Sequence, residues 1–342
     1  MIGIGLLGYG YWGPNLARCF GEHADCRLTV VHDRDPAMRT RAERRHLGTR
    51  IAATAAEVFE DPAVDAVAIA TPVSTHWELG LGALQAGKHV LIEKPIAASE
   101  REASALVDAA ARAGRILMVD HTFVYTPAVQ KIRELVDAGA LGALHYYDSV
   151  RVNLGLFQSD VNVLWDLAVH DLAILGHIFD ESPISITAQT GRHLPGRPES
   201  MALVTLAYPS GAVAHVNVNW LAPVKVRQTL LGGSKKMLVY NDLEPSEKIK
   251  VYDRGAHVIG DRAQSDALRV GYRTGDMWAP HLPSTEPLRN LVDHFVDCIR
   301  TGRRPRTDGQ VGREIVGLLE AAECSAREGG LPISLGIERL AS

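Results

Sequence analysis

Two different hydrophobic patterns divide the chain near residue 120. Before this point, short runs that are apolar at every position alternate with longer amphipathic stretches. Continuously apolar runs are typical of strands buried on both faces, and their alternation with helices predicts a doubly wound, parallel α/β sheet. The expected strands are Ile2–Leu7, Leu28–Val31, Ala66–Ala70, Val90–Ile92 and Ile116–Val119, and the expected helices are Pro14–Phe20, Pro36–Leu47, Thr75–Ala86 and Glu100–Arg112.

After residue 120 the pattern changes to an alternation with a period of two. In the segment Ala212–Trp220, Ala214 and Val216 face one side and His215 faces the other. This alternation predicts an antiparallel sheet with one face on the core. Further strands are expected at Leu144–Asn153, Ile184–Gly191, Met201–Tyr208, Val226–Leu231, Lys236–Tyr240 and Glu247–Tyr252, helices at Val161–His177, Pro287–Arg300 and Gln310–Arg327, and an irregular surface segment at Arg254–Pro283.

The change of pattern and the length predict two domains. The chain has 342 residues, and we assign residues 1–122 to a nucleotide-binding domain and residues 123–342 to a substrate domain. The C-terminal helices could pack back toward the first domain.

Composition excludes several classes of partner. The formal net charge is −4, which gives no electrostatic case for binding nucleic acid or an anionic membrane surface. No apolar run in the sequence approaches the roughly 20 residues that span a bilayer. The apolar N-terminus lacks a basic n-region, so we interpret it as a strand and expect a cytoplasmic protein. The four cysteines show no metal-ligand spacing, and we expect no metal site.

A glycine-rich turn follows the first expected strand and opens a helix. It consists of Gly8, Tyr9, Gly10, Tyr11, Trp12 and Gly13. In this context the first glycine permits a tight turn, the second lets backbone amides approach a pyrophosphate, and the third allows close helix–strand packing. The helix N-terminus then favours the anion. The sequence therefore predicts a dinucleotide site.

Asp33 ends the second strand, twenty residues beyond Gly13. A carboxylate at this position accepts hydrogen bonds from the adenosine ribose hydroxyls and repels a 2′-phosphate, which favours NAD over NADP. Arg34 follows directly and could stack on adenine or tolerate a phosphate, so NADP stays open as the less favoured cofactor.

Polar residues also follow two other strands of the expected sheet. Thr71 and Pro72 end one strand, and His76 begins the next helix. Glu93 and Lys94 end another. Ligands of open α/β sheets bind outside the carboxyl ends of the strands, so these residues are candidates for cofactor contact. A proline-terminated strand and a surface histidine are the alternative interpretation.

These motifs resemble the Gfo/Idh/MocA family, the relatives of glucose–fructose oxidoreductase and inositol dehydrogenase. The resemblance covers essentially the whole chain. It implies a Rossmann domain followed by an α/β domain whose large, open, mainly antiparallel sheet serves oligomerisation, so we expect a homodimer or homotetramer. The stretches that carry it are Gly8–Gly13, Ala70–Pro72 with His76, and Gly87–Pro95, which ends in Glu93-Lys94-Pro95.

Within the family, other stretches are similar to a branch that oxidises the 3-hydroxyl of nucleotide sugars. Such a branch makes the ketone that an aminotransferase needs, which implies a pathway aminotransferase as a possible partner. Val169 stands where that branch leads us to expect proline. The stretches are Gly8–Asn15, Asn153–Gln158, Asp160–Asp166, and Gly233–Met237 with Glu244–Lys248.

Asp166 and His170 are spaced i, i+4 on an expected helix, so both side chains leave the same face. In inositol dehydrogenase-like members such a pair works with the lysine of the Glu-Lys-Pro motif. Oxidising a secondary alcohol requires a group that takes the hydroxyl proton, and histidine titrates near neutrality. Asp166 could orient the imidazole or bind a neighbouring hydroxyl, and Lys94 could donate a hydrogen bond to the developing alkoxide. Spacing alone also fits an exposed helix pair.

The substrate residues are less constrained. Besides Asp166 and His170, we select His121, Tyr125, Arg151, Asn153, Gln158 and Asn162. The first two begin the crossing into the second domain, and the others could bind hydroxyls or a diphosphate, with solvated positions as the alternative.

The hypothesis is therefore an NAD-dependent dehydrogenase of a sugar secondary alcohol, with the 3-hydroxyl of a nucleotide sugar such as a UDP-hexose as the leading version. The alternatives are an inositol, cyclitol or free-sugar dehydrogenase, a ketosugar reductase of the same family, and a non-catalytic nucleotide sensor.

Overall fold

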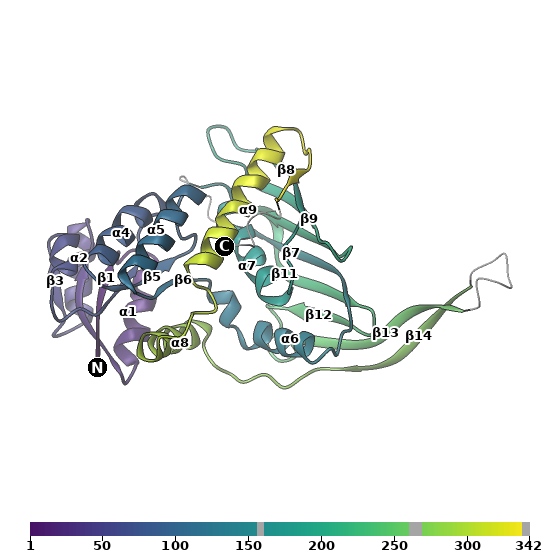
Figure 1. The fold of residues 1–342 in the computed structure, drawn as a ribbon, viewed down its shortest axis with the longest axis horizontal. Helices are drawn as coiled ribbons and strands as arrows, with labels where there is room; N and C mark the ends of the chain where they lie inside the picture. Colours follow the sequence, from purple (N-terminus) through teal and green to yellow (C-terminus); the bar gives the residue numbers. More distant parts are fainter. Residues whose placement is uncertain (156–160, 260–268, 337–342) are drawn as a thin grey trace. The chain divides into compact units, whose positions relative to one another are not determined.

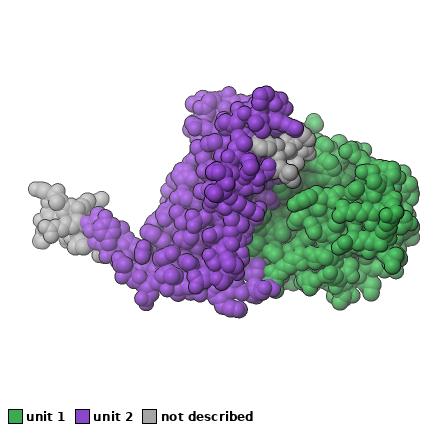
Figure 2. Space-filling view, turned by 180° about the vertical axis from the view of Figure 1, so that it is seen from behind, with its two compact units in different colours: residues 1–126, 285–320 green, residues 127–284, 321–342 purple. Residues whose placement is uncertain are grey.

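The chain divides into two compact units (Figure 2). In this computed structural model, residues 1–155, 161–259 and 269–336 are described. The first unit consists of Met1–Thr126 and Thr285–Glu320, and the second of Pro127–Ser284 and Ala321–Ser342. Residues 285–320, which the sequence-based division placed in the second domain, thus cluster with the first unit.

The first unit is built on six parallel strands in the order β3-β2-β1-β4-β5-β6, which confirms the doubly wound sheet. The order reverses between β1 and β4, and this switch point is where such sheets bind ligands. The strands are β1 (Ile2–Leu7), β2 (Cys26–His32), β3 (Arg50–Ala52), β4 (Ala66–Ile69), β5 (His89–Glu93) and β6 (Leu117–Asp120).

Helices flank this sheet, and in Figure 1 α4 lies beside α5 and α1 beside α8. Short elements such as β3 and α3 were not predicted, because three to five residues carry too little periodicity. The helices are α1 (Gly13–Glu22), α2 (Pro36–Arg45), α3 (Ala55–Phe59), η1 (Val73–Thr75), α4 (His76–Gln85), α5 (Glu100–Ala113), η2 (Thr122–Tyr125) and α8 (Pro287–Thr301).

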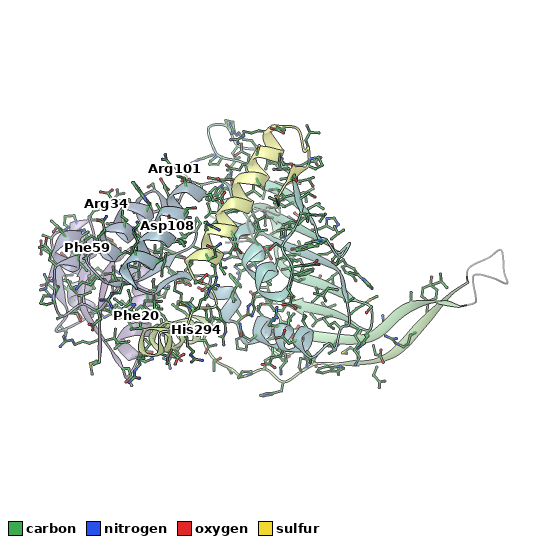
Figure 3. All side chains as sticks on the ribbon, in the orientation of Figure 1. Phe20, Arg34, Phe59, Arg101, Asp108 and His294 are labelled. Carbon is green, nitrogen blue, oxygen red and sulfur yellow. The ribbon has the colours of Figure 1, made fainter. Side chains whose placement is uncertain are left out.

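Aromatic packing fixes α8 to the first unit. Phe20 on α1 meets Phe295 on α8 edge to face, with 6.3 Å between ring centroids. His294, which Figure 3 labels with Phe20, tilts against Tyr125 of η2 at 5.6 Å. These rings explain why a segment remote in sequence completes the core of the first unit. Helix α9 (Gly309–Arg327) begins in the first unit and ends in the second.

The described part of the second unit forms a nine-stranded sheet in the order β14-β13-β12-β11-β7-β10-β9-β8-β15. Only the pair β7–β10 is parallel among its registers, so the sheet is mainly antiparallel, as predicted. Its strands are β7 (Leu144–Leu154), β8 (Ser185–Gly191), β9 (Met201–Ala207), β10 (Val213–Asn219), β11 (Leu221–Gly233), β12 (Met237–Asn241), β13 (Ile249–Ile259), β14 (Arg269–Trp278) and β15 (Ile333–Ser334).

One face of this sheet is covered and the other is open. Strand β10 shows the expected alternation, because Ala214, Val216 and Val218 are fully buried whereas His215 is exposed. The covered face carries α6 (Pro127–Asp137), the π-helical turn η3 (Leu164–Ala168) and α7 (Val169–Ile178) (Figure 1). Helix α6 was not predicted.

Two expectations about local structure were wrong. Within the segment Arg254–Pro283, residues 254–259 and 269–278 are not irregular, because they belong to the paired strands β13 and β14, which extend beyond the other strands (Figure 1). Exposed strands need no apolar face, so Gly255 and Gly275 were mistaken for loop signals. The helix expected at Val161–His177 is not uniform either, since its first turn is π-helical. No helix in the described ranges is long and apolar enough to cross a membrane.

Candidate active site

The glycine-rich turn has the shape that a dinucleotide requires. Gly8 has φ +91°, and a Cβ there would lie 2.6 Å from the carbonyl oxygen of Ala70. A Cβ on Gly13 would lie 2.0 Å from the carbonyl oxygen of Gly8, so both positions exclude a side chain. At Gly10, by contrast, a Cβ would meet nothing within 4 Å. The turn is closed underneath and open at Gly10, which fits a pyrophosphate approaching its backbone.

Asp33 is fixed beside this turn at the end of β2. Its Oδ2 accepts the Tyr9 N–H at 2.6 Å and its Oδ1 accepts the Asp35 N–H at 2.8 Å. The carboxylate is thus held at the rim of the turn with lone pairs left for ribose hydroxyls. Arg34, labelled in Figure 3, is exposed beside it.

The three aromatic side chains of the turn lie in different surroundings, although the sequence selected all three for cofactor contact. Tyr9 is fully buried, and its hydroxyl lies 2.9 Å from Nε2 of His46, the residue that directly follows α2. Only its backbone therefore faces the turn. Tyr11 is 88% exposed at the tip. Trp12 donates from Nε1 to Oδ2 of Asp120 at 2.8 Å.

His76 holds two strand ends together instead of contacting a ligand. It is 1% exposed, with Nδ1 2.8 Å from the Pro95 carbonyl oxygen and Nε2 2.8 Å from the Thr71 carbonyl oxygen. Burial lowers the pKa of His76. The imidazole thereby joins the segment after β4 to the segment after β5, and Thr71 and Pro72 remain at the surface of that edge.

Glu93 and Lys94 lie at the carboxyl end of β5, partly exposed. The Glu93 carboxylate accepts the backbone N–H of Lys94, which fixes the start of the following turn. Glu93 pairs with Asp120 across the ladder between β5 and β6. Lys94 therefore leaves the sheet next to Asp120 and His121.

His121 is a buried imidazole that the described residues leave without hydrogen bonds. It is 1% exposed, and neither ring nitrogen has a partner within those residues. Burial lowers its pKa to about 3, and the charge of Lys94 acts in the same direction. A neutral, unsatisfied ring at the carboxyl edge of the sheet fits a site that a polar ligand completes.

Tyr125 belongs to the core instead of to a ligand site. It is 1% exposed, and its hydroxyl lies 3.1 Å from Oγ1 of Thr307. Burial raises the pKa of Tyr125. We therefore withdraw the expectation that its side chain contacts substrate.

In the second unit, Asp166 lies in η3 and His170 in the first turn of α7. Both are partly exposed. Oδ2 of Asp166 accepts a hydrogen bond from Nε1 of the buried Trp220 at 3.0 Å. A spacing of four residues is close to one turn in π- and α-helical geometry alike, so the pair shares one side.

Arg151 is placed differently from the prediction. Its Nε lies 2.6 Å from Oδ2 of Asp171, and Oδ1 of Asp171 accepts the Ser149 hydroxyl at 2.6 Å. The arginine and aspartate side chains are 7% and 1% exposed. Because β7 alternates, Arg151 points to the covered face and pairs with α7. This buried ion pair joins β7 to α7 and is not open to a diphosphate.

The remaining candidates precede the helix. Asn162 caps it, since its Oδ1 accepts the N–H groups of Leu164 and Trp165 at 3.0 and 3.3 Å. Asn153 is partly exposed on β7, and Gln158 lies outside the described residues. Nδ2 of Asn162 also donates to Glu323 at 2.6 Å. Asn162 borders a cavity of about 390 Å³, which is also lined by Thr190, Glu199, Glu323, Ala326 and Arg327.

Sequence reasoning missed Asp120 and Glu323. Asp120 directly follows the predicted strand Ile116–Val119, so the same rule that selected Thr71 and Lys94 could have found it. Glu323 accepts from Asn162 and, at 2.8 Å, from Nε1 of Trp165. No pattern in the sequence connects residues so far apart.

Comparison with known proteins agrees with this geometry. Residues 2–121 match the oxidoreductase family profile for the NAD-binding Rossmann fold of Gfo/Idh/MocA proteins, and residues 129–239 match the C-terminal domain profile of the same family. Together the two matches span more than half of the chain.

Individual relatives are distant but cover most of the chain. It is 26% identical to scyllo-inositol 2-dehydrogenase (NAD(+)) of Bacillus subtilis, over 99% of this chain and 96% of the relative. It is 27% identical to UDP-N-acetylglucosamine 3-dehydrogenase of Acidithiobacillus ferrooxidans, over 74% and 76%. The solved structure of that type of enzyme from A. ferrooxidans superposes with a TM-score of 0.80 at 25% identity, covering 96% of this chain and 99% of the other.

With an NAD-binding Rossmann domain, a matching C-terminal domain and dehydrogenases of alcohols as relatives, the chain belongs to the Gfo/Idh/MocA family and is an NAD-dependent oxidoreductase that acts on CH–OH groups.

Proposed function

We propose that this enzyme transfers hydride between NAD and a secondary alcohol of a sugar, giving a ketosugar, and that the 3-hydroxyl of a nucleotide sugar such as a UDP-hexose is the reacting group. The observation that carries the proposal is the Asp166/His170 pair. Asp166 is already held by Trp220 at 3.0 Å, one turn before a partly exposed histidine. A packed carboxylate beside an accessible imidazole is the arrangement that a proton acceptor needs.

When bound, NAD supplies the hydride acceptor. The residues of the chain then have to accept the hydroxyl proton and stabilise the negative charge that develops on the oxygen. His170 takes the hydroxyl proton, and Asp166 orients the imidazole or binds the adjacent hydroxyl. Lys94, at the end of β5, donates a hydrogen bond to the developing alkoxide.

The cofactor residues fit NAD better than NADP. Asp33 presents a carboxylate where a 2′-phosphate would have to lie, and it is anchored by two backbone N–H groups. Moving this charge aside would break both hydrogen bonds.

The substrate assignment rests on the relatives. The 3-dehydrogenase of a UDP-sugar is among them, and it supports the nucleotide-sugar version. If the product is a 3-ketosugar, an aminotransferase that uses it is a suitable pathway partner. Arg151 is buried in its ion pair with Asp171, so it is no longer a candidate for binding the diphosphate.

The second candidate function, an inositol, cyclitol or free-sugar dehydrogenase, is favoured by the match to scyllo-inositol 2-dehydrogenase over nearly the whole chain. A ketosugar reductase would use the same residues in reverse.

Substitution of the two polar residues tests the catalytic assignment. We expect Lys94→Ala and His170→Ala to lower kcat by about 10²–10⁴-fold, because each removes a group that acts on the alcohol oxygen. NADH binding, followed by nucleotide fluorescence, should persist in both variants.

Two exposed residues provide matched controls. Lys225→Ala and His145→Ala remove the same side-chain types from exposed positions and should leave kcat unchanged. Full activity of both Lys94→Ala and His170→Ala would show that the assigned residues do not carry the reaction.

A further inference from the structure

One hydrogen bond joins the glycine-rich turn to the far strand of the carboxyl edge of the first sheet, which is the edge where we expect the cofactor and which we call the cofactor edge. Trp12 follows β1, whereas Asp120 ends β6, and β4 and β5 lie between these strands. At about 4.8 Å per strand, β1 and β6 are about 14 Å apart. Because Nε1 of Trp12 donates to Oδ2 of Asp120 at 2.8 Å, the segment from the end of β1 to the Trp12 side chain has to reach across the carboxyl ends of the two intervening strands. That edge includes the switch point and Lys94.

Asp120 is a charged type of residue in a buried position, since the residue is only 1% exposed. Burying a carboxylate is costly unless its oxygens are satisfied. Here Oδ2 accepts from Trp12, and Oδ1 accepts the hydroxyl of Thr122. Both oxygens act as acceptors, which is the hydrogen-bonding pattern of an ionised carboxylate.

Opposing effects act on this carboxyl group. Burial raises the pKa of Asp120, and the hydrogen bonds from Thr122 and Trp12 and the charge of Lys94 act against that rise. His121 also experiences the charge of Lys94, but its ring is neutral. Of these two neighbours of the lysine, Asp120 is the one that can balance its positive charge.

We propose that Asp120 is a positioning residue that connects the two parts of the cofactor edge. One oxygen holds the glycine-rich turn through Trp12, and the negative charge holds the Lys94 ammonium at the end of β5. The role of Lys94 in this statement rests on the proposed function, whereas the anchoring of the turn does not.

Two substitutions separate the hydrogen bond from the charge. Asp120→Asn keeps an oxygen that accepts from Trp12 and removes the charge, and the Thr122 hydroxyl can turn to accept from the new amide. Trp12→Phe keeps an aromatic ring and removes the donor. Asp108→Asn and Trp77→Phe are matched controls in the same unit. Asp108, labelled in Figure 3, is exposed, and Trp77 is 39% exposed.

The experiment measures NADH affinity by fluorescence titration and kcat at saturating NAD, on the full chain. Trp12→Phe should weaken NADH binding about tenfold, which corresponds to about 1.4 kcal/mol, and leave kcat within about twofold. Asp120→Asn should do the reverse, with NADH affinity kept and kcat lowered about tenfold or more. Both controls should match the native chain.

Each other result overturns the proposal. Native NADH affinity in Trp12→Phe would refute the anchor, and native kcat in Asp120→Asn would refute the charge role. Parallel losses of both quantities in both variants would indicate a purely structural residue. If no alcohol were turned over at all, the proposed function would fail while the NADH titration would still decide on the anchor.

Discussion

At the scale of single residues, two carboxylates at strand ends divide the chemistry of the first unit. Asp33 directly follows β2 and accepts hydrogen bonds from the backbone N–H groups of Tyr9, in the glycine-rich turn, and of Asp35. Asp120 ends β6, is buried, and receives Trp12 and Thr122 beside Lys94. We propose that the first carboxylate selects the cofactor by charge and that the second positions the edge that the cofactor approaches.

Asp33→Asn tests the selection by charge. The amide no longer repels a 2′-phosphate, so we expect the ratio of NADP to NAD affinity to rise by about tenfold or more. The amide oxygen can replace only one of the two carboxylate oxygens as a hydrogen-bond acceptor. Because the lost hydrogen bond affects the binding of both cofactors alike, the ratio of the two affinities reports the effect of the charge alone. Titration with NADH and NADPH measures it, and an unchanged ratio would show that Asp33 does not discriminate.

His121 predicts a specific pH dependence of stability. Burial lowers its pKa in the folded chain to about 3, from an ordinary value of 6.5. Between these values the unfolded state binds the additional proton, so stability falls as the pH falls. From about pH 7.5 to about pH 5, His121 alone should cost about 2 kcal/mol of unfolding free energy.

The variant His121→Gln should lack that share of the pH dependence. Chemical denaturation at both pH values measures it, with the exposed His145→Gln as control. If the unfolding free energy changed between the two pH values by the same amount in His121→Gln as in the native chain, the result would contradict a buried, neutral imidazole at position 121.

At the scale of elements, the side chains of strand β7 alternate between the covered face and the open face of the second sheet. Tyr147, Ser149 and Arg151 are buried on the covered face, whereas Asp148 and Val150 face the open side. The prediction that Arg151 binds substrate failed because the sequence could not say which face α7 would cover. Once α7 is in place, Asp171 lies opposite Arg151, and the pair joins α7 to β7.

The open face of the second sheet is the surface on which we propose that copies of the chain associate. Leu203 on β9 and Leu230 on β11 are 42% and 39% exposed. The registers place Leu203 opposite Asn217, and Thr205, His215, Asp148 and Leu230 in one cross-strand row, so the leucines share this face. An open antiparallel sheet with apolar positions on its free side suits a homodimer or homotetramer.

Charge on that face should disrupt the assembly. We expect Leu203→Asp and Leu230→Asp to shift the chain toward monomers, because an interface disfavours unpaired buried carboxylates. Light scattering coupled to size exclusion measures the mass. Leu47→Asp, at a position that is 91% exposed in the first unit, is the control. A monomeric native chain would exclude this interface.

At the scale of the whole molecule, the chain crosses three times between its units. It leaves the first unit after Thr126, returns at Thr285 and leaves again after Glu320. The core of the first unit therefore depends on contacts such as Phe20 with Phe295. Sequence patterns are local, so they found the parallel sheet and α8 but not which unit α8 completes.

The same limit explains which site residues the sequence could predict. The glycine-rich turn, Asp33 and Lys94 follow from strand ends, and the spacing of Asp166 and His170 follows from one helix turn. His76, Tyr125 and Arg151 were misjudged because their partners, Pro95, Thr307 and Asp171, are set by tertiary packing. Asp120 could have been selected by the same strand-end rule, but its hydrogen bond with Trp12, more than 100 residues away, could not be predicted from a local pattern.

The most direct test of the account is the formation of NADH from candidate alcohols. The purified chain is incubated with NAD and with UDP-sugars, free sugars or inositols, and the oxidised carbon of any product is identified. We predict an increase in NADH absorbance with a UDP-hexose and a ketone at carbon 3. Reaction with inositol alone would support the second candidate function. No NADH from any alcohol, by a chain that binds NADH, would contradict the central claim.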